Sequence, residues 1–510
     1  MTRNAEPVEI LSGLYLFVDT CNVYVIKEGD RAIAIDFGSG KWMDSLADLG
    51  IHHLDHVFLT HDHPDQCEGL LNRPEWPFTI HAASGYLLPH EVADFHSLPT
   101  LGVGCPASYS VLPKGIPNII YNMYEFFDFF WGKRRICFIE TPGHGRHSAS
   151  VILEHAGKEV VFCGDAAYAD AKIWQPYHLE WEHSRGIGAM AAWQGVMHLH
   201  ELGMDILCPS HGPVIDKQPR QMLRRLAKRL MDFFIAKGCI CAGEKDYNIE
   251  TEAVLPGVRR YLPSLYQYGA NGYLLVSKTG EGLVVDPYMP DMEALEALLN
   301  HLGGIKPTAQ LCSHYHIDHC DGIPYLRQKY GTKAYLHPWV AAPIKDIQNT
   351  FAPYLPNDSI LPDTLWPEVG KWQWNEYEFD VAPMPGQTWW HCGFMTTINF
   401  QRVCFGGDSF QPTSRWNGTG GYCAYNNSRF DGFIYSANLL LDWNPDIMAM
   451  GHAAAYYFKP SHARAIIKWA KKAEQATRAL CPTGDLEQDY YIVHGNSNLY
   501  KASLKDVLPK

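Results

Sequence analysis

The sequence is poor in positive charge and contains no long apolar run. Lys and Arg together number 42 against 55 Asp and Glu, which gives a formal net charge of −13. The one basic stretch, residues 220–228, has the spacing of a single helix face, so we expect no nucleic-acid partner. A helix that spans a bilayer needs ~20 mostly apolar residues. The most apolar stretch, residues 121–131, is shorter and carries Glu125 and Asp128, so we expect no membrane contact.

The sequence also has no Cys-x-x-Cys pair, and we expect no signal peptide. The 14 cysteines include no Cys-x-x-Cys pair, and a chain of 510 residues can fold without disulfides. Cys239 and Cys241 form the one close pair, and two thiols alone do not complete a zinc site. Residues 1–9 contain no basic segment followed by an apolar run, which disfavours a signal peptide. These features predict a cytoplasmic protein with free thiols.

What the sequence does contain is an internal repeat. The stretch His61–Gly69, HDHPDQCEG, reappears as His314–Gly322, HYHIDHCDG. Five further pairs of segments match in the same order: Asn22–Tyr24 with Asn271–Tyr273, Ile33–Asp36 with Leu283–Asp286, Thr141–His144 with Met384–Gln387, Phe162–Asp165 with Phe405–Asp408, and Ser210–His211 with Gly451–His452. Six features in one order indicate a tandem duplication of a domain of ~200 residues.

The repeat sets the expected domain boundaries. We predict a first copy at residues 1–218, a connecting helix and linker at 219–255, a second copy at 256–470 and a C-terminal extension at 471–510. Residues 221–235 have helical spacing, and Gly238 is expected to end that helix. No low-complexity segment separates the copies, so we expect them to pack together as an internal pseudo-dimer.

Short apolar strands alternate with helical segments inside each copy. In the first copy we expect strands at residues 23–26, 32–35, 57–60, 135–139, 150–153, 159–163 and 206–208. Helical spacing occurs at residues 42–49 and 189–202. Mixed short strands with intervening helices indicate an α/β fold in which helices cover sheets.

The apolar strand at residues 57–60 runs directly into His61. Extended backbone places alternate side chains on one face, so His61, His63 and Asp65 could all point into one cavity. Neutral imidazoles and carboxylates are ordinary ligands of zinc and iron. Because the cluster occurs twice, it predicts a metal site in each copy.

These motifs resemble those of the metallo-β-lactamase superfamily. The matching patterns are His-x-His-x-Asp-His, Pro-Gly-His, Gly-Asp and a late Ser-His or Gly-His, and they extend over residues 8–218 and 258–460. The resemblance implies two tandem αββα sandwiches. In each, two mixed β-sheets would face each other, with helices outside and the metal site along one edge.

The resemblance also implies ligand roles at two neighbouring metal positions, which we call the first and second positions. In the first copy, the implied ligands are His61, His63 and His144 at the first position, Asp65 and His211 at the second, and Asp165 between the two. In the second copy, they are His314 and His316 at the first position, Asp318, His319 and His452 at the second, and Asp408 between the two. The expected cofactor is Zn²⁺, one or two ions per active copy.

Each copy departs from this pattern at one place. Gln66 stands where the second position of the first copy would have a histidine, and Gln387 stands where the first position of the second copy would have one. A neutral amide is a weaker zinc ligand than imidazole. The first copy keeps a three-histidine set and is the better candidate for catalysis. In the second copy His391 could replace Gln387, although an ordinary loop histidine is the simpler interpretation.

The metal determines the expected chemistry. A bound divalent ion lowers the pKa of its water toward ~7, and two ions would lie ~3.5–4 Å apart. We therefore expect a hydrolase that uses metal-bound hydroxide on a small ester, thioester, lactone or amide. Asp65 and Asp318 are expected to orient the water and accept its proton. Asp36 and Asp286, at strand ends, would either orient a ligand histidine or serve as turn carboxylates.

Several alternatives stay open at this point. An iron-dependent redox enzyme, similar to persulfide dioxygenases or flavodiiron proteins, uses related ligands, and one copy could be only a structural partner of the other. Three arginines near the motifs could hold a substrate carboxylate or phosphate: Arg146, Arg185 and Arg415. Residues 416–427 have the composition of a mobile loop. Trp366, Trp372 and Trp374 could line an apolar cleft or lie between the copies.

Overall fold

The computed structural model describes residues 6–72, 75–83, 114–145, 147–180, 188–237, 249–350, 352, 354–410 and 428–491. These residues form two compact units. The first takes in the described residues up to 236 together with the segment 475–490, and the second takes in 237–474 and Tyr491. Helix α4 (Pro219–Lys237), in the predicted linker, therefore lies almost wholly in the first unit. Cys239 and Cys241 lie outside the described residues.

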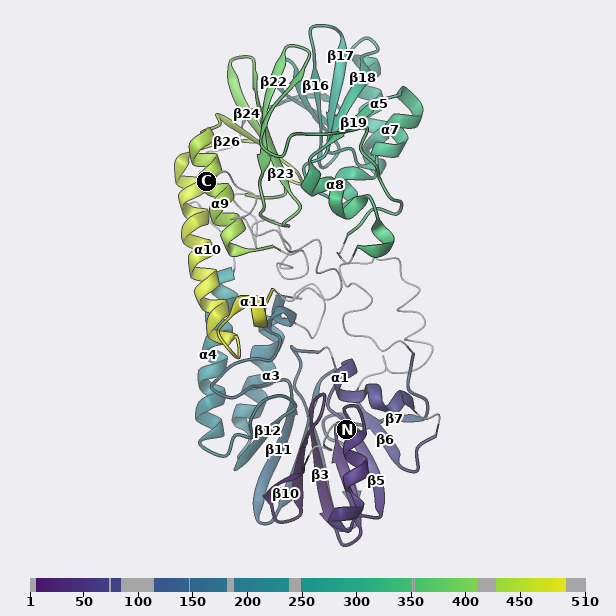
Figure 1. Cartoon of the computed structure of the whole chain (residues 1–510). Coiled ribbons are helices and arrows are strands. Elements are labelled where there is room, and N and C mark those ends of the chain that lie inside the picture. The colour runs from purple at the N-terminus through teal and green to yellow at the C-terminus, as the bar shows by residue number, and fades with distance from the viewer. Residues whose placement is uncertain are drawn as a thin grey trace. The chain divides into compact units, whose positions relative to one another are not determined.

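Two mixed sheets build the first copy (Figure 1). The larger sheet has the order β1 (Val8–Leu11), β2 (Leu14–Val18), β3 (Asn22–Glu28), β4 (Arg31–Ile35), β5 (His53–Leu59), β6 (Thr79–Ala82) and β7 (Ile119–Tyr121). Strands β1 to β4 pair antiparallel, and β4 to β7 pair parallel. The smaller sheet has the order β12 (Ile206–Pro209), β11 (Lys158–Gly164), β10 (Ala149–His155), β9 (Arg134–Glu140) and β8 (Phe129–Trp131).

Alternating apolar side chains join these two sheets. Ile33 and Phe58 of the larger sheet share one buried cluster with Val151 and Phe162 of the smaller sheet, so the sheets pack face to face. The opposite face of the larger sheet is covered by the short 3₁₀ helices η1 (Lys41–Ser45) and η2 (Ala47–Leu49), which bury Trp42. Because both faces are covered, β3 has a continuous apolar run at residues 23–26 and β4 one at residues 32–35, rather than apolar residues at alternate positions.

The helices of the first copy connect these strands. They are α1 (Pro64–Cys67), η3 (Glu68–Asn72), η5 (Pro176–Glu180), α3 (Ala189–Glu201) and α4. The expected helix at residues 42–49 is two 3₁₀ segments, and the expected helices at 189–202 and 221–235 are α3 and α4. All seven expected strands fall on strands of the structure.

The second copy repeats the arrangement with its own two sheets. One has the order β13 (Glu252–Leu255), β14 (Val258–Leu262), β15 (Leu265–Tyr268), β16 (Gly272–Val276), β17 (Glu281–Val285), β18 (Lys306–Leu311), β19 (Lys333–Leu336) and β20 (Thr364–Leu365). The other has the order β21 (Gly370–Trp374), β22 (Tyr377–Pro383), β23 (Cys392–Ile398), β24 (Gln401–Gly407), β25 (Ile447–Met450) and β26 (Tyr456–Tyr457). Leu283 and Phe405, from the two sheets, share one buried cluster.

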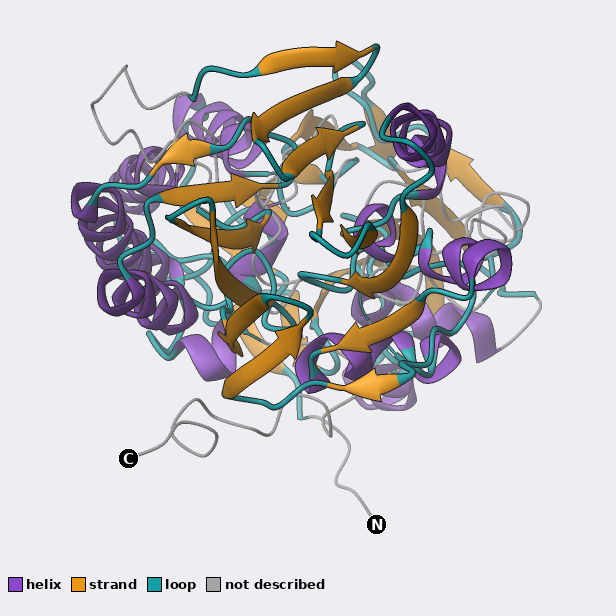
Figure 2. Cartoon of the chain, turned by 90° about the horizontal axis from the view of Figure 1, so that it is seen from above, coloured by secondary structure: helices purple, strands orange, loops and turns teal. Residues whose placement is uncertain are grey.

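Helices complete the second copy and flank the strands in Figure 2. They are η6 (Met289–Asp291), α5 (Met292–His301), α6 (Ile317–Cys320), α7 (Ile323–Tyr330), α8 (Pro338–Ile344), η7 (Ile347–Asn349), α9 (Phe430–Trp443) and α10 (Pro460–Leu480), followed by α11 (Leu486–Asp489) in the first unit. Each copy is thus a sandwich of two mixed sheets with helices outside, as expected. Trp366 and Trp374 belong to the buried cluster between the sheets, and Trp372 packs against it, so these tryptophans do not line a cleft.

Candidate metal centres in the two copies

The end of strand β5 carries the first two histidines of the motif. Thr60 and His61 follow the strand directly, and His63 precedes helix α1 in extended backbone (φ −72°, ψ 149°). Pro64 begins the helix, because its fixed φ suits the first helical position and its missing N–H needs no partner there. Asp65 therefore lies in the first helical turn. The expected extended backbone thus ends at His63, and Asp65 comes to the site from the helix, with its Oδ2 3.3 Å from Nε2 of His211.

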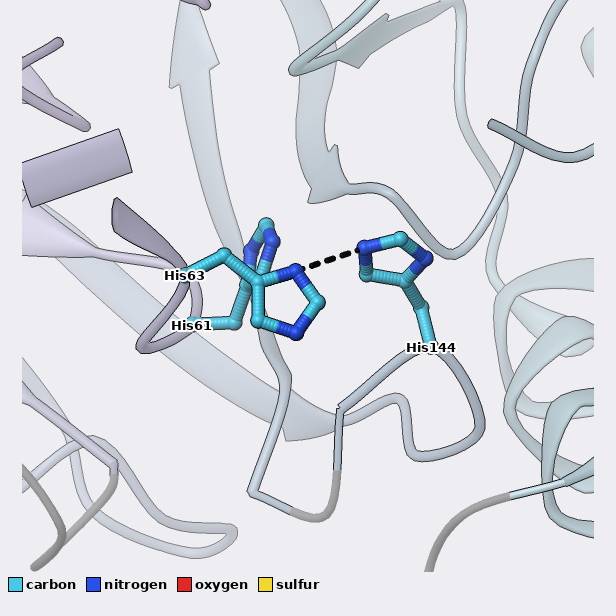
Figure 3. Close-up of side chains that lie close together, drawn as sticks. All are labelled: His61, His63 and His144. Carbon is cyan, nitrogen blue, oxygen red and sulfur yellow. Dashed lines mark hydrogen bonds between the residues drawn. The ribbon is translucent and has the colours of Figure 1, made fainter. Parts of the chain in front are cut away.

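His144 joins these two histidines from the loop between β9 and β10. One ligand atom from each of His61, His63 and His144 lies within 4.8 Å of the others, and all three residues are buried. Nδ1 of His63 and Nε2 of His144 lie 2.9 Å apart, as the dashed line in Figure 3 shows. Burial lowers the pKa of His63 to about 4 and that of His144 well below its usual value. Neutral imidazoles with converging nitrogens are what a divalent metal requires.

A hydroxyl group orients the first histidine of each motif. Thr60 Oγ1 donates to Asp36 Oδ1 at 2.9 Å and lies 3.0 Å from Nδ1 of His61. Since its single proton goes to the carboxylate, the hydroxyl accepts from Nδ1–H, so in the neutral form of His61 the nitrogen without a proton is Nε2. In the second copy, Ser313 Oγ donates to Asp286 Oδ2 at 2.7 Å and lies 3.1 Å from Nδ1 of His314.

These orphaned nitrogens fit a bound metal. Nε2 of His61 and Nε2 of His314 are buried and have no hydrogen-bond partner among the described residues. A buried polar atom without a partner costs free energy unless a ligand supplies one. The structure thus places Asp36 and Asp286 where they orient a ligand histidine through a hydroxyl, rather than only closing a turn.

The second copy brings together two groups of candidate ligands that share Asp408. One group consists of His314, His316 and Asp408, and the other of Asp318, His319, Asp408 and His452. In the second group, Nε2 of His452 lies 2.7 Å from Asp318 Oδ2 and 3.3 Å from Asp408 Oδ2. A carboxylate shared by two groups of ligands is the arrangement expected between two neighbouring ions.

The corresponding carboxylates of the first copy are arranged differently. Asp65, Asp165 and His211 form no converging group among the described residues. Nδ1 of His211 lies 2.9 Å from Asp165 Oδ1, and Nε2 of the same ring lies 3.3 Å from Asp65 Oδ2. Burial lowers the pKa of His211, but the charges and hydrogen bonds of Asp165 and Asp65 outweigh it and raise the pKa to about 10.

Both glutamines lie beside the carboxylate between the two positions. Gln387 Nε2 donates to Asp408 Oδ2 at 3.1 Å. Gln66 is fully buried, and its Nε2 lies 3.5 Å from Asp165 Oδ2. A neutral amide binds a metal through its oxygen rather than its nitrogen, so Oε1 is the atom of either glutamine that could reach an ion in this orientation.

Some sequence-predicted residues lie elsewhere. His391 is fully buried and its ring stacks on His314 at 5.0 Å and 15°, and it belongs to neither ligand group of the described second copy. Arg146, Arg185, Arg415 and the segment 416–427 lie outside the described residues.

Two aromatic residues of the first copy were not anticipated from the sequence. The ring of His178, on η5, stacks on His63 with centroids 4.8 Å apart and lies 4.7 Å from His144. Trp174 lies flat on His211, with centroids 4.3 Å apart and planes at 12°. Both residues follow the Gly164-Asp165 motif in a segment without a repeat partner, so no pattern in the sequence singled them out.

A comparison with protein families identifies this fold and its repeat. The model of the Metallo-beta-lactamase superfamily matches residues 16–211 and residues 265–452, more than half of the chain. The chain belongs to the metallo-beta-lactamase superfamily. It contains two tandem superfamily domains, with histidine-rich candidate metal sites in both.

Individual relatives are more distant. Hydroxyacylglutathione hydrolases of Xylella fastidiosa, from strains M12 and 9a5c, are each 38% identical over 64 residues, which is 12% of this chain and 23% of the relative. The match therefore spans less than a quarter of these relatives. The subclass B3 metallo-beta-lactamase MEM-A1 from a soil metagenome is 19% identical, with a TM-score of 0.34 over 44% of this chain and 94% of that chain. The di-zinc enzyme LRA-12 from an Alaskan soil metagenome is 15% identical, with a TM-score of 0.34 over 43% and 94%.

Proposed function

We propose that this protein is a zinc-dependent hydrolase of a small thioester or ester, with its catalytic centre in the first copy at His61, His63 and His144. The observation that carries the proposal is the convergence of three buried imidazoles, two of which have a pKa below the usual range. Three nitrogen ligands with room for a water or substrate are typical of catalytic zinc.

The chain's own residues supply the rest of the site. A bound zinc ion would polarise the substrate carbonyl and lower the pKa of a water beside it. Asp65 lies next to the histidines, and although burial raises its pKa, the hydrogen bond with His211 and the charges of His63 and His211 together outweigh burial and lower the pKa. The ionised carboxylate of Asp65 can therefore accept a proton at neutral pH, and we assign it the role of general base.

The substrate class rests on the weaker support of the relatives. The proteins that match in part are named hydroxyacylglutathione hydrolases, which cleave a thioester. Net charge −13 disfavours a polyanionic substrate such as RNA. A small thioester is therefore the first substrate to test, followed by esters and lactones.

The full chain is dialysed against zinc and then tested for hydrolysis of a panel of acyl thioesters. Release of the free thiol is the measured quantity. His63→Ala is expected to abolish the activity, and chelation should remove it reversibly. His316→Ala, its counterpart in the second copy, is the matched control and should leave most of the activity. Activity that survives His63→Ala but disappears in His316→Ala would move the catalytic centre to the second copy, and iron in place of zinc would overturn the assignment.

A further inference from the structure

The late histidines of the two copies meet their carboxylates in different ways. In the second copy a single nitrogen, Nε2 of His452, lies 2.7 Å from Asp318 and 3.3 Å from Asp408. In the first copy His211 uses one nitrogen for each carboxylate, with Nδ1 2.9 Å from Asp165 and Nε2 3.3 Å from Asp65. Ligands of one ion must point at one place. His452 satisfies this condition. His211 lies between its two carboxylates, and its Nε2 is also 3.3 Å from the backbone oxygen of Thr20.

Stacking holds the His211 ring in this orientation. Trp174 lies flat on it at 4.3 Å and 12°, and Tyr168 stacks on Trp174 at 6.3 Å and 13°. The backbone differs as well, because His452 has left-handed dihedrals (φ 50°), and His211 does not. Both nitrogens of His211 could therefore turn toward one metal ion only if the stack of Trp174 and Tyr168 moved.

The two copies also differ at the positions of His319 and Gly451. In the second copy, Nδ1 of His319 lies 3.1 Å from Asp286. A Cβ at Gly451 would fall 2.3 Å from Oδ1 of Asp408 and 2.7 Å from Cε1 of His319, so these two side chains together leave room only for glycine. In the first copy, Gln66 occupies the position that corresponds to His319, and Ser210 occupies the position that corresponds to Gly451. Ser210 Oγ donates to Asp36 at 2.5 Å. The serine hydroxyl satisfies the carboxylate that the histidine satisfies in the other copy.

We propose that the first copy holds a single metal ion, on His61, His63 and His144, and that the His211 ring joining Asp65 to Asp165 takes the place of a second ion. The second metal position is kept only in the second copy. This inference rests on the proposed function, because it assumes that the three histidines bind a metal. It also leaves Asp65 free of metal, as its role as a general base requires.

Matched substitutions in the two copies test the proposal through metal content. The full chain and its variants are dialysed against zinc and then against buffer, and zinc per chain is measured by elemental analysis. Asp65→Asn is expected to leave the zinc content unchanged, whereas Asp318→Asn in the second copy should lower it by one ion per chain. Asparagine matches aspartate in size, and thermal unfolding of each variant checks that it folds.

A substitution at Gly451 gives a second test, again by measurement of zinc per chain. Gly451→Ser should lower the zinc content by one ion, because its Cβ would fall 2.3 Å from Asp408 Oδ1 and 2.7 Å from Cε1 of His319. Loss of an ion in Asp65→Asn would overturn the inference while leaving the proposed function standing. No loss in His61→Ala would instead overturn the proposed function, so the two failures are distinguishable.

Discussion

Ser210 Oγ donates a hydrogen bond of 2.5 Å to Oδ2 of the buried Asp36. Asp36 follows β4 in the larger sheet of the first copy, and Ser210 follows β12 in the smaller one. The bond therefore ties the ends of the two sheets together directly beneath the histidines. The same carboxylate accepts from the backbone N–H of Thr60 at 2.8 Å, so Asp36 joins both sheets to the motif.

Removing this hydroxyl should destabilise the first copy. A hydrogen bond to a buried charged group contributes about 1–3 kcal/mol, so we expect Ser210→Ala to lower the free energy of unfolding by that amount. Urea denaturation followed by circular dichroism measures the change. Ser12→Ala, at an exposed position, is the control and should change stability by less than about 0.5 kcal/mol. Equal effects of the two substitutions would refute the role of the hydroxyl.

A buried histidine far from the metal residues should make the second copy sensitive to acid. His337 Nδ1 accepts from the N–H of Trp339 at 3.1 Å, and Nε2 lies 2.9 Å from the carbonyl oxygen of Glu368. Burial lowers its pKa to about 4. In the unfolded chain the pKa of His337 is ~6.5, so the unfolded chain binds the proton at higher pH than the folded one. The free energy of unfolding should therefore fall as pH decreases from 6.5 to 4.

The size of that effect can be isolated with one variant. The pKa difference corresponds to at most about 3 kcal/mol. His337→Asn keeps an acceptor for the N–H of Trp339 but does not titrate in this range, so its melting temperature should fall less between pH 6.5 and 4 than that of the parent chain. Scans in the presence of a chelator remove any contribution from metal loss. Parallel pH profiles for the two proteins would show that His337 is not the sensitive group.

The loop that presents His144 depends on a glycine. Gly143 has φ +128°, and a Cβ there would fall 2.3 Å from Cα of Ala192 in helix α3. Gly143→Ala should therefore displace His144 and weaken zinc binding by ~10-fold or more, because ligand position is lost. Gly157→Ala is a suitable control, since Gly157 also has positive φ (+72°) but its Cβ would meet open space. Titration with a zinc-competing chromophore measures both affinities, and equal values would contradict this account.

His178 should act on zinc binding through the orientation of His63. Its ring stacks on His63 at 4.8 Å and 26°. We expect His178→Phe, which keeps a flat ring, to preserve zinc affinity, and His178→Ala to weaken it by ~10-fold. If phenylalanine weakened binding as much as alanine, the imidazole nitrogens of His178 would matter rather than its ring.

The repeat explains why so much could be predicted from the sequence. His61, His63 and Asp65 follow an apolar strand in a pattern that recurs at His314, His316 and Asp318. The recurrence predicted the duplication, and the resemblance of the motifs to those of the superfamily predicted the sandwich fold. Asp65 is not on extended backbone as expected, because Pro64 starts a helix. Which nitrogen of His211 meets which carboxylate depends on the stacking of Trp174, a tertiary contact that leaves no periodic signal.

Metal content per chain tests the central claim most directly. We expect the zinc-dialysed full chain to retain zinc, His61→Ala to lose one ion, and His314→Ala to lose zinc from the second copy while the first copy keeps its ion. Those losses should occur without unfolding, since both histidines lie at the ends of strands in buried clusters that stay intact. A chain that binds no zinc, or one whose zinc content is the same in both variants as in the parent, would contradict this account.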